Sequence, residues 1–189
     1  MIILYPTETI YALGVNAFDT EALASLYELK GRESSKSVSV LVRNIEDIGR
    51  YAYLGNKARK LAENFLPGPL TLVLKVKEDV PSTLATSDGT LGFRVSSDMV
   101  AQKVITDFME KYKAPLTCTS ANISGEDTFS RVSDILEQFG DKSRMIDKIY
   151  DDGFRSDTSS TVVKIVDEKI TILRSGKISE NNIRSILDN

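Results

Sequence analysis

Positively charged side chains gather in one short stretch of the sequence, LKGRESSKS. Lys30, Arg32 and Lys36 fall within seven positions, beside Gly31 and several serines. An arginine fork and a lysine point charge both suit phosphate, and hydroxyls and backbone N–H groups can bind the same anion. Lys30 also has a structural explanation, because a cation in the last turn of a helix favours the helix dipole. Arg32 and Lys36 lie beyond that helix, so the stretch is a candidate phosphate site, although it lacks the GxxxxGK[ST] pattern of a Walker A loop.

Two runs of small polar residues follow strand-like segments. CTSANISG contains Ser120 and Asn122, which either contact a nucleotide or belong to a simple turn. YPTETIYALG places Thr7, Glu8 and Thr9 after a strand and a proline. Hydroxyls and a carboxylate at such a position can face a ligand cleft or cap a turn.

Two arginines lie in or beside predicted strands. Arg94 stands between two apolar residues in TLGFRV, so its side chain should point to the opposite face of the sheet from both neighbours. Arg174 ends a strand just before a serine and a glycine, and Ser160 opens the segment STVVKI. Each arginine can bind a carboxylate or phosphate bidentately, and each alone also fits a surface charge.

The composition narrows the chemistry open to these residues. The chain has 189 residues, no histidine and one cysteine, which excludes Ser-His-Asp and Cys-His catalysis, zinc sites built on histidine, and internal disulfides. Catalysis must use lysine, arginine, carboxylates, hydroxyls and backbone groups, with an oxygen-bound metal such as Mg2+. The net charge of -3 argues against general nucleic-acid binding, and no apolar run reaches the ~20 residues of a membrane span. The length of the chain predicts one domain, residues 1–189. The N-terminal MIILYPTET lacks a signal-peptide pattern and there is one cysteine, so we expect the reducing cytoplasm as its location.

Alternating strand and helix patterns must position the candidate residues. Strands are predicted at residues 2–5, 38–42, 70–76, 91–95, 115–119, 160–166 and 169–173. Helices are predicted at residues 20–30, with Asp19 as the cap and Gly31 as the end, and at 56–65, 99–112, 132–139 and 181–187. The spacing is irregular and includes a hairpin, which favours an α/β domain with a mixed sheet over a pure βαβ array.

Taken together, the motifs resemble one family. YPTETIYALG, LKGRESSKSVSVLV, PGPLTLVL, TLGFRV, TSANISG, SSTVV and LRSGKI occur in the order found in the YrdC/Sua5 (TsaC) proteins, and in the length of their short single-domain form. The resemblance implies an open, twisted mixed sheet flanked by helices, with a concave face that holds a nucleotide. It also implies an L-threonylcarbamoyladenylate synthase, a nucleotidyltransferase that uses ATP with Mg2+, L-threonine and bicarbonate and releases pyrophosphate. Partner proteins would transfer the threonylcarbamoyl group to adenosine 37 of tRNA, and a weak direct contact with RNA is part of this expectation.

The resemblance also assigns roles to residues of this chain. The residues expected to bind ATP are Lys30, Arg32, Lys36, Ser120, Asn122, Ser130 and Arg174, of which Lys30 and Arg32 would act in catalysis. The residues expected to bind L-threonine are Thr9, Thr90, Arg94 and Ser160. No protein-held metal site is expected. A carbamate oxygen would attack the α-phosphorus of ATP, a step that requires positioning and charge neutralisation and no covalent nucleophile.

Departures from the family pattern leave open reduced activity or a divergent paralogue with another substrate, and two other readings compete with the synthase. Ala12, Ser37 and Leu41 stand where many members have glycine, proline and histidine, and TFS replaces the usual SPT before residue 131. A binding module of the same fold, an RNA- or ribosome-associated factor without turnover, is the first alternative. A related carbamoyl-transfer chemistry is the second, but the chain lacks the length and the cysteines of the large enzymes that perform it.

Overall fold

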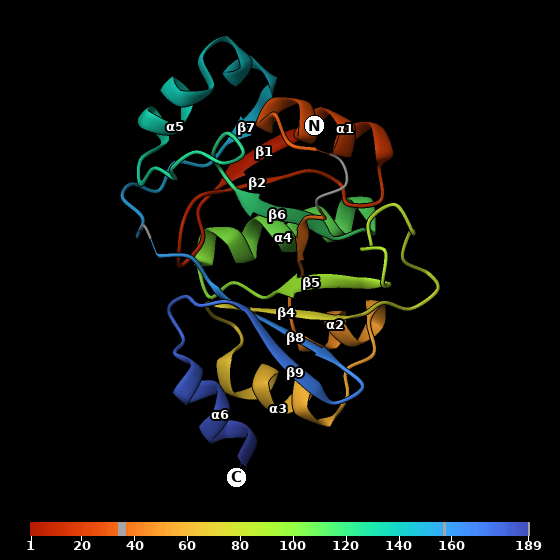
Figure 1. Ribbon diagram of the computed structural model, residues 1–189. Coiled ribbons are helices and arrows are strands. Elements are labelled where there is room, and N and C mark those ends of the chain that lie inside the picture. The colour runs from red at the N-terminus through yellow and green to blue at the C-terminus, as the bar shows by residue number, and fades with distance from the viewer. Residues whose placement is uncertain (34–36, 157, 189) are drawn as a thin grey trace.

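A computed structural model describes residues 1–33, 37–156 and 158–188. Lys36, one of the predicted phosphate ligands, lies outside the described residues. In the part of the chain that the structure describes, nine strands form one mixed sheet in the order β7-β1-β2-β6-β3-β5-β4-β8-β9. Figure 1 shows this sheet running the length of the molecule, with the N-terminus near β1 and the C-terminus at the opposite end beside α6.

The strands combine parallel and antiparallel neighbours. Pairs β1/β7, β3/β5 and β4/β8 are parallel, whereas β1/β2, β2/β6, β3/β6, β4/β5 and β8/β9 are antiparallel. The strand bounds are β1 Ile2–Tyr5, β2 Ala12–Gly14, β3 Ser39–Leu41, β4 Leu70–Lys75, β5 Thr90–Arg94, β6 Leu116–Ser120, β7 Ile146–Ile149, β8 Thr161–Val166 and β9 Lys169–Arg174. The mixed sheet predicted from the sequence is therefore confirmed.

Helices cover the sheet along its length. Their bounds are α1 Thr20–Lys30, α2 Ile45–Tyr51, α3 Asn56–Phe65, α4 Met99–Tyr112, α5 Val132–Phe139, the 3-10 helix Gly140–Met145 and α6 Glu180–Asp188. Helix α4 packs on β1 and β6, α3 packs on β4, and α6 packs on α3 (Figure 1). No helix within the described ranges is both long enough and apolar enough to cross a membrane.

The ends of α1 follow directly from its sequence. The Asp19 carboxylate accepts hydrogen bonds from the backbone N–H groups of Glu21 and Ala22, both at 3.0 Å. Gly31 ends the helix in the left-handed region, at φ 57°, where a side chain would be strained. The chain then turns back, and the backbone N–H of Arg32 donates to the carbonyl of Tyr27 at 2.9 Å. This ending places Lys30 in the last turn and Arg32 beyond the helix, as the sequence predicted.

Buried strands form the centre of the described structure. All residues of β1, β2 and β5 are buried, and the buried apolar side chains of the described residues form one continuous core. Four elements were not predicted from the sequence: β2, α2, the 3-10 helix and β7. Strand β2 has only three residues, and half of the residues of β7 are charged, so neither has the hydrophobic pattern that a strand prediction needs.

Candidate functional site

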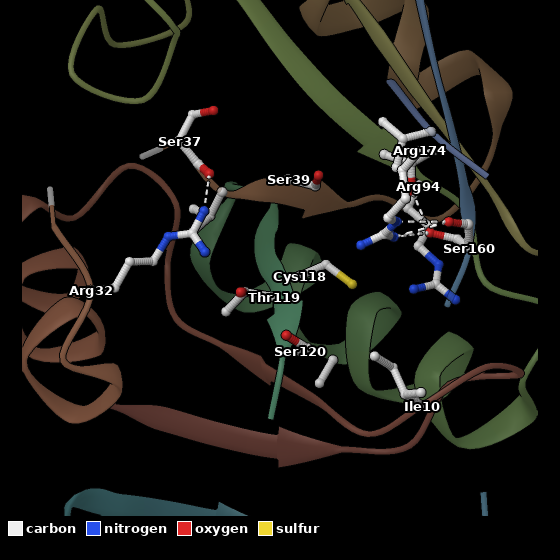
Figure 2. A pocket seen from close by; sticks show the side chains of 14 residues that line it. Ile10, Arg32, Ser37, Ser39, Arg94, Cys118, Thr119, Ser120, Ser160 and Arg174 are labelled. Atoms are coloured by element: carbon white, nitrogen blue, oxygen red, sulfur yellow. Dashed lines mark hydrogen bonds between the residues drawn. The ribbon is translucent and has the colours of Figure 1, made fainter. Parts of the chain in front are cut away.

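A polar cleft opens over the central strands of the sheet. Its volume is about 680 Å3, counted to its open mouth. It is lined by Ile10, Ala12, Arg32, Ser37, Val38, Ser39, Thr71, Arg94, Cys118, Thr119, Ser120, Ser160, Val162 and Arg174. Figure 2 shows Arg32 on one side of the cleft, and Arg94, Arg174 and Ser160 together on the other. Three guanidinium groups from distant parts of the sequence therefore converge on one cavity.

Arg94 is held at the end of β5 by a cluster from the loop after β1. Its Nη2 donates to Glu8 Oε1 at 2.7 Å, to Thr7 Oγ1 at 3.2 Å, and to Thr9 Oγ1. Burial alone would raise the pKa of Glu8, but the charge and hydrogen bond of Arg94, with a hydrogen bond from Ser96, lower it below its ordinary value. The Glu8–Arg94 ion pair is therefore present at neutral pH, with 6% of the Arg94 side chain exposed.

Arg174 and Ser160 meet on the same side of the cleft. The Nε and Nη2 groups of Arg174 donate to the Ser160 carbonyl at 3.1 and 2.9 Å, and Nη2 also donates to Ser160 Oγ at 3.1 Å. Thr71 Oγ1 lies 2.9 Å from the same Ser160 oxygen. Burial, and then the charge of Arg94, lowers the pKa of Arg174 below its ordinary value. Two close guanidinium groups raise each other's electrostatic energy, so an anion bound beside them would be stabilised.

Lys30 lies beneath the loop that follows β6 instead of lining the cleft. Only 1% of the residue is exposed. Its Nζ donates to the Ser120 carbonyl, to the Asn122 carbonyl at 2.7 Å and to Asn122 Oδ1 at 3.3 Å. These three acceptors match the three N–H groups of an ammonium. Burial lowers the pKa of Lys30 to about 7, and the charge of Arg32 acts in the same direction.

The loop after β6 is fixed by its own polar groups as well as by Lys30. Ser120 Oγ donates to Asn122 Oδ1 at 2.6 Å, and Asn122 Nδ2 donates to the Glu126 carbonyl at 2.6 Å. The Ser124 N–H donates to the Lys30 carbonyl at 2.8 Å. Arg32, just beyond α1, also lines the cleft, and its Nη2 donates to the Ser37 carbonyl at 2.8 Å. Ser120 lines the cleft, whereas Asn122 is used within the loop.

Two residues with predicted ligand contacts, Thr90 and Ser130, are not among the residues that line the cleft. Thr90 lies at the opposite end of β5 from Arg94, and its Oγ1 is hydrogen-bonded to Asp88 Oδ1 and Thr86 Oγ1, both at 2.8 Å. Ser130 lies outside the cleft lining, and its carbonyl accepts from the backbone N–H of Arg155 at 2.9 Å. The turn that precedes β5 therefore engages Thr90, and neither residue is among the groups that the fold brings to the cavity. Thr9 is fully buried and does not line the cleft, but its Oγ1 accepts a hydrogen bond from Arg94 Nη2.

The structure adds residues that sequence reasoning did not select. Thr71 and Ser39 line the cleft from β4 and β3. Glu8, a candidate from its place after β1, does not line the cleft but fixes Arg94. Thr71 is the only polar residue in LTLVL, which is the signal that identifies it in hindsight. A Cβ at Gly92 would lie 2.4 Å from Ser39 Oγ, so this glycine provides the space that Ser39 occupies. Among the departures from the family pattern, Ala12 and Ser37 line the cleft, whereas Leu41 is fully buried.

The cleft lining is cationic and rich in hydroxyl groups. It includes no aspartate or glutamate, and the described residues contain no group of three or more side chains suited to a metal ion. Such a site fits polyanionic and carboxylate ligands. A divalent cation would need most of its oxygen ligands from such an anion.

Comparison with known proteins identifies the family. The model of the Sua5/YciO/YrdC family, described as telomere recombination, matches residues 1–176. The chain belongs to this family. It is 34% identical over 178 residues to a putative threonylcarbamoyl-AMP synthase from Methanocaldococcus jannaschii, which covers 94% of the chain and 80% of that relative.

Solved structures of the family share the fold. Sua5 of Pyrococcus abyssi in complex with L-threonine is 31% identical, with a TM-score of 0.86 over 98% of the chain and 53% of that protein. YciO of E. coli is 26% identical, with a TM-score of 0.84 over 96% of the chain and 86% of that protein. The chain thus spans about half of the archaeal Sua5 protein and most of YciO. The open mixed sheet flanked by helices is the architecture of this family.

Proposed function

We propose that this protein is a threonylcarbamoyl-AMP synthase. It would combine L-threonine, bicarbonate and ATP and release pyrophosphate, as a step in the modification of adenosine 37 of tRNA. The observation that carries the proposal is the convergence of Arg32, Arg94 and Arg174 on one cleft, whose described lining residues include no carboxylate. The names of the M. jannaschii relative and of several further relatives support the same activity.

The two sides of the cleft would receive different parts of the substrates. Arg32 and Ser120 lie on the side next to α1, where Lys30 adds positive charge from beneath the loop when its amine is protonated. This side would hold the phosphates of ATP. Arg94, with Ser160 and Arg174, lies on the other side and would hold the carboxylate of L-threonine and the neighbouring part of the nucleotide (Figure 2).

The reaction needs positioning and charge neutralisation from these groups. The threonine amine and bicarbonate form a carbamate with loss of water. A carbamate oxygen then bonds to the α-phosphorus, and the bond from this phosphorus to the bridging oxygen breaks, so that pyrophosphate leaves with the electron pair. Fixed cations that face the departing pyrophosphate lower this barrier because charge develops there in the transition state. Arg32 is the side chain that we assign to this task, with Lys30 acting through the field beneath the loop.

Mg2+ fits this site as a companion of ATP. Among the described residues the lining offers hydroxyl oxygens and no carboxylate, so the phosphates of the nucleotide and water would provide most of its ligands. When bound, Mg2+ would offset negative charge on the pyrophosphate. We further propose that the adenylate passes to separate transfer proteins that act on tRNA, and that the protein works in the cytoplasm, where these tRNAs lie.

The proposal is tested by direct detection of the product. Wild-type protein is incubated with ATP, Mg2+, L-threonine and 13C-labelled bicarbonate, and threonylcarbamoyl-AMP is identified by its labelled mass. Labelled product from wild-type protein, and none from a folded Arg32→Ala variant, is expected. Absence of the product from wild-type protein, together with salt-dependent retention of RNA, would favour the binding-module alternative.

A further inference from the structure

Glu8 is a carboxylate that the protein holds at both oxygens. Oε1 accepts from Arg94 Nη2 at 2.7 Å. Oε2 accepts from Ser96 Oγ and from the backbone N–H of Ser97 at 3.2 Å. The backbone carbonyl of Glu8 also accepts from Lys177 Nζ at 2.9 Å. Because both ends of this residue are fixed, its carboxylate is a rigid support and not a mobile surface charge.

The hydrogen bonds of Arg94 are distributed unevenly over its guanidinium. Within the described residues, every hydrogen bond that Arg94 donates from its side chain starts at Nη2, toward Glu8, Thr7 and Thr9. Nε is buried without a partner. Nη1 donates to no described residue, and unlike Nε it is not sealed off, because the arginine lines the cleft. Nη1 is therefore the nitrogen that a ligand in the cleft can reach.

We propose that Glu8 is a positioning residue for the amino-acid substrate, which fixes Arg94 through Nη2 and so presents Nη1 to the substrate carboxylate. This inference rests on the proposed function and deepens it. An arginine fork binds a carboxylate well only when its plane is already aligned, since a long side chain otherwise loses rotamer freedom on binding. Glu8 provides the alignment before the substrate arrives.

Glu8 also supplies the countercharge that Arg94 needs while the cleft is empty of amino acid. A buried guanidinium without a partner is costly. In this site a second guanidinium lies nearby, close enough that the charge of Arg94 lowers the pKa of Arg174. The anchored carboxylate stabilises Arg94 in its ligand-binding position without entering the cleft, because Glu8 does not line it. The substrate carboxylate therefore meets a guanidinium that is already in place and does not have to displace Glu8.

A purely structural role for the ion pair makes a different prediction. In that case, loss of Glu8 would lower stability and reduce the amount of active protein, with little change in KM for either substrate. Asp47 provides a matched control, because its carboxylate forms a bidentate pair with Arg43, at 2.7 and 2.8 Å, and its side chain is 8% exposed. Neither Asp47 nor Arg43 lines the cleft.

The experiment compares Glu8→Ala, Glu8→Gln and Asp47→Asn with wild-type protein. KM and kcat are measured for L-threonine and for ATP, and L-threonine binding is measured by calorimetry without turnover. For Glu8→Ala we expect KM for L-threonine to rise by about tenfold or more, because misplaced binding groups cost on this order. KM for ATP should stay within about twofold, since uniform loss of amino-acid binding leaves the other substrate unaffected. Glu8→Gln keeps an oxygen that can accept from Arg94, so its KM for L-threonine should lie between those of Glu8→Ala and wild-type protein. Asp47→Asn should leave KM for L-threonine unchanged.

Several outcomes would overturn the inference. One is an unchanged KM for L-threonine in Glu8→Ala, and another is an equal rise in the KM of ATP. Wild-type protein that binds L-threonine but forms no adenylate would contradict the proposed function, whereas the calorimetric comparison with Glu8→Ala would still decide the role of Glu8. Wild-type protein that does not bind L-threonine at all would overturn both.

Discussion

Replacement of Lys30 by methionine is expected to change how stability depends on pH. Burial and the charge of Arg32 lower the pKa of Lys30 from 10.5 to about 7 in the folded protein. Between these values the unfolded chain holds a proton that the folded protein has lost, so the free energy of unfolding rises with pH in this window. Integration of the linkage relation from pH 7 to pH 9 gives a gain of about 2 kcal/mol in wild-type protein. The methionine variant lacks this gain.

The composition of the chain reduces the number of other groups that contribute to this pH dependence. It contains no histidine, so no imidazole titrates near neutral pH. All other titratable groups are present in both proteins, so their contributions cancel in the difference. Urea unfolding at several values between pH 6.5 and pH 9, followed by circular dichroism, gives the two stability curves. Parallel curves would refute the reasoning, because they would mean that the three oxygens around Nζ keep Lys30 charged throughout.

Two further predictions concern single side chains. Thr71→Val removes the hydroxyl beside Ser160 Oγ, so it should lower the free energy of unfolding by about 1 kcal/mol and raise KM for a substrate. Thr71→Ser keeps the hydroxyl and should restore the KM. Thr117 is a buried threonine outside the cleft, so Thr117→Val should leave the KM unchanged. Equal kinetics in the valine variants would show that Thr71 only packs. Glu168→Ala removes the carboxylate that accepts from the Lys57 N–H in the first turn of α3, at 3.2 Å, and should cost about 0.5–2 kcal/mol in thermal unfolding with unchanged activity. A change in activity, or no loss of stability, would contradict this role.

Local signals made a large part of the fold predictable. Asp19 and Gly31 define both ends of α1 because a side-chain cap and a left-handed glycine act within a few residues. The irregular alternation of strand and helix patterns, with a hairpin, predicted the mixed sheet. Strands β2 and β7 lack such local signals. They form because they pair with neighbouring strands that are distant in the sequence or more strongly patterned.

The candidate site was predictable in its charged residues and less so in their orientation. Arg32, Arg94 and Arg174 reach one cleft, as the motifs indicated. The burial of Lys30 depends on carbonyl oxygens about ninety residues further along the chain, and no local pattern reveals such a contact. The same limit applies to Glu8, whose partner Arg94 lies on another strand. Tertiary contacts decide which cation faces the ligand and which supports a loop.

The most direct test of the account is pyrophosphate release from ATP in the presence of Mg2+ and bicarbonate, with and without L-threonine. The convergence of three arginines on one cleft predicts release that depends on L-threonine and on bicarbonate and that is lost in Arg32→Ala. Folding of the variant is checked by circular dichroism. Release that is independent of any amino acid, or no release from folded wild-type protein, would contradict the proposed activity.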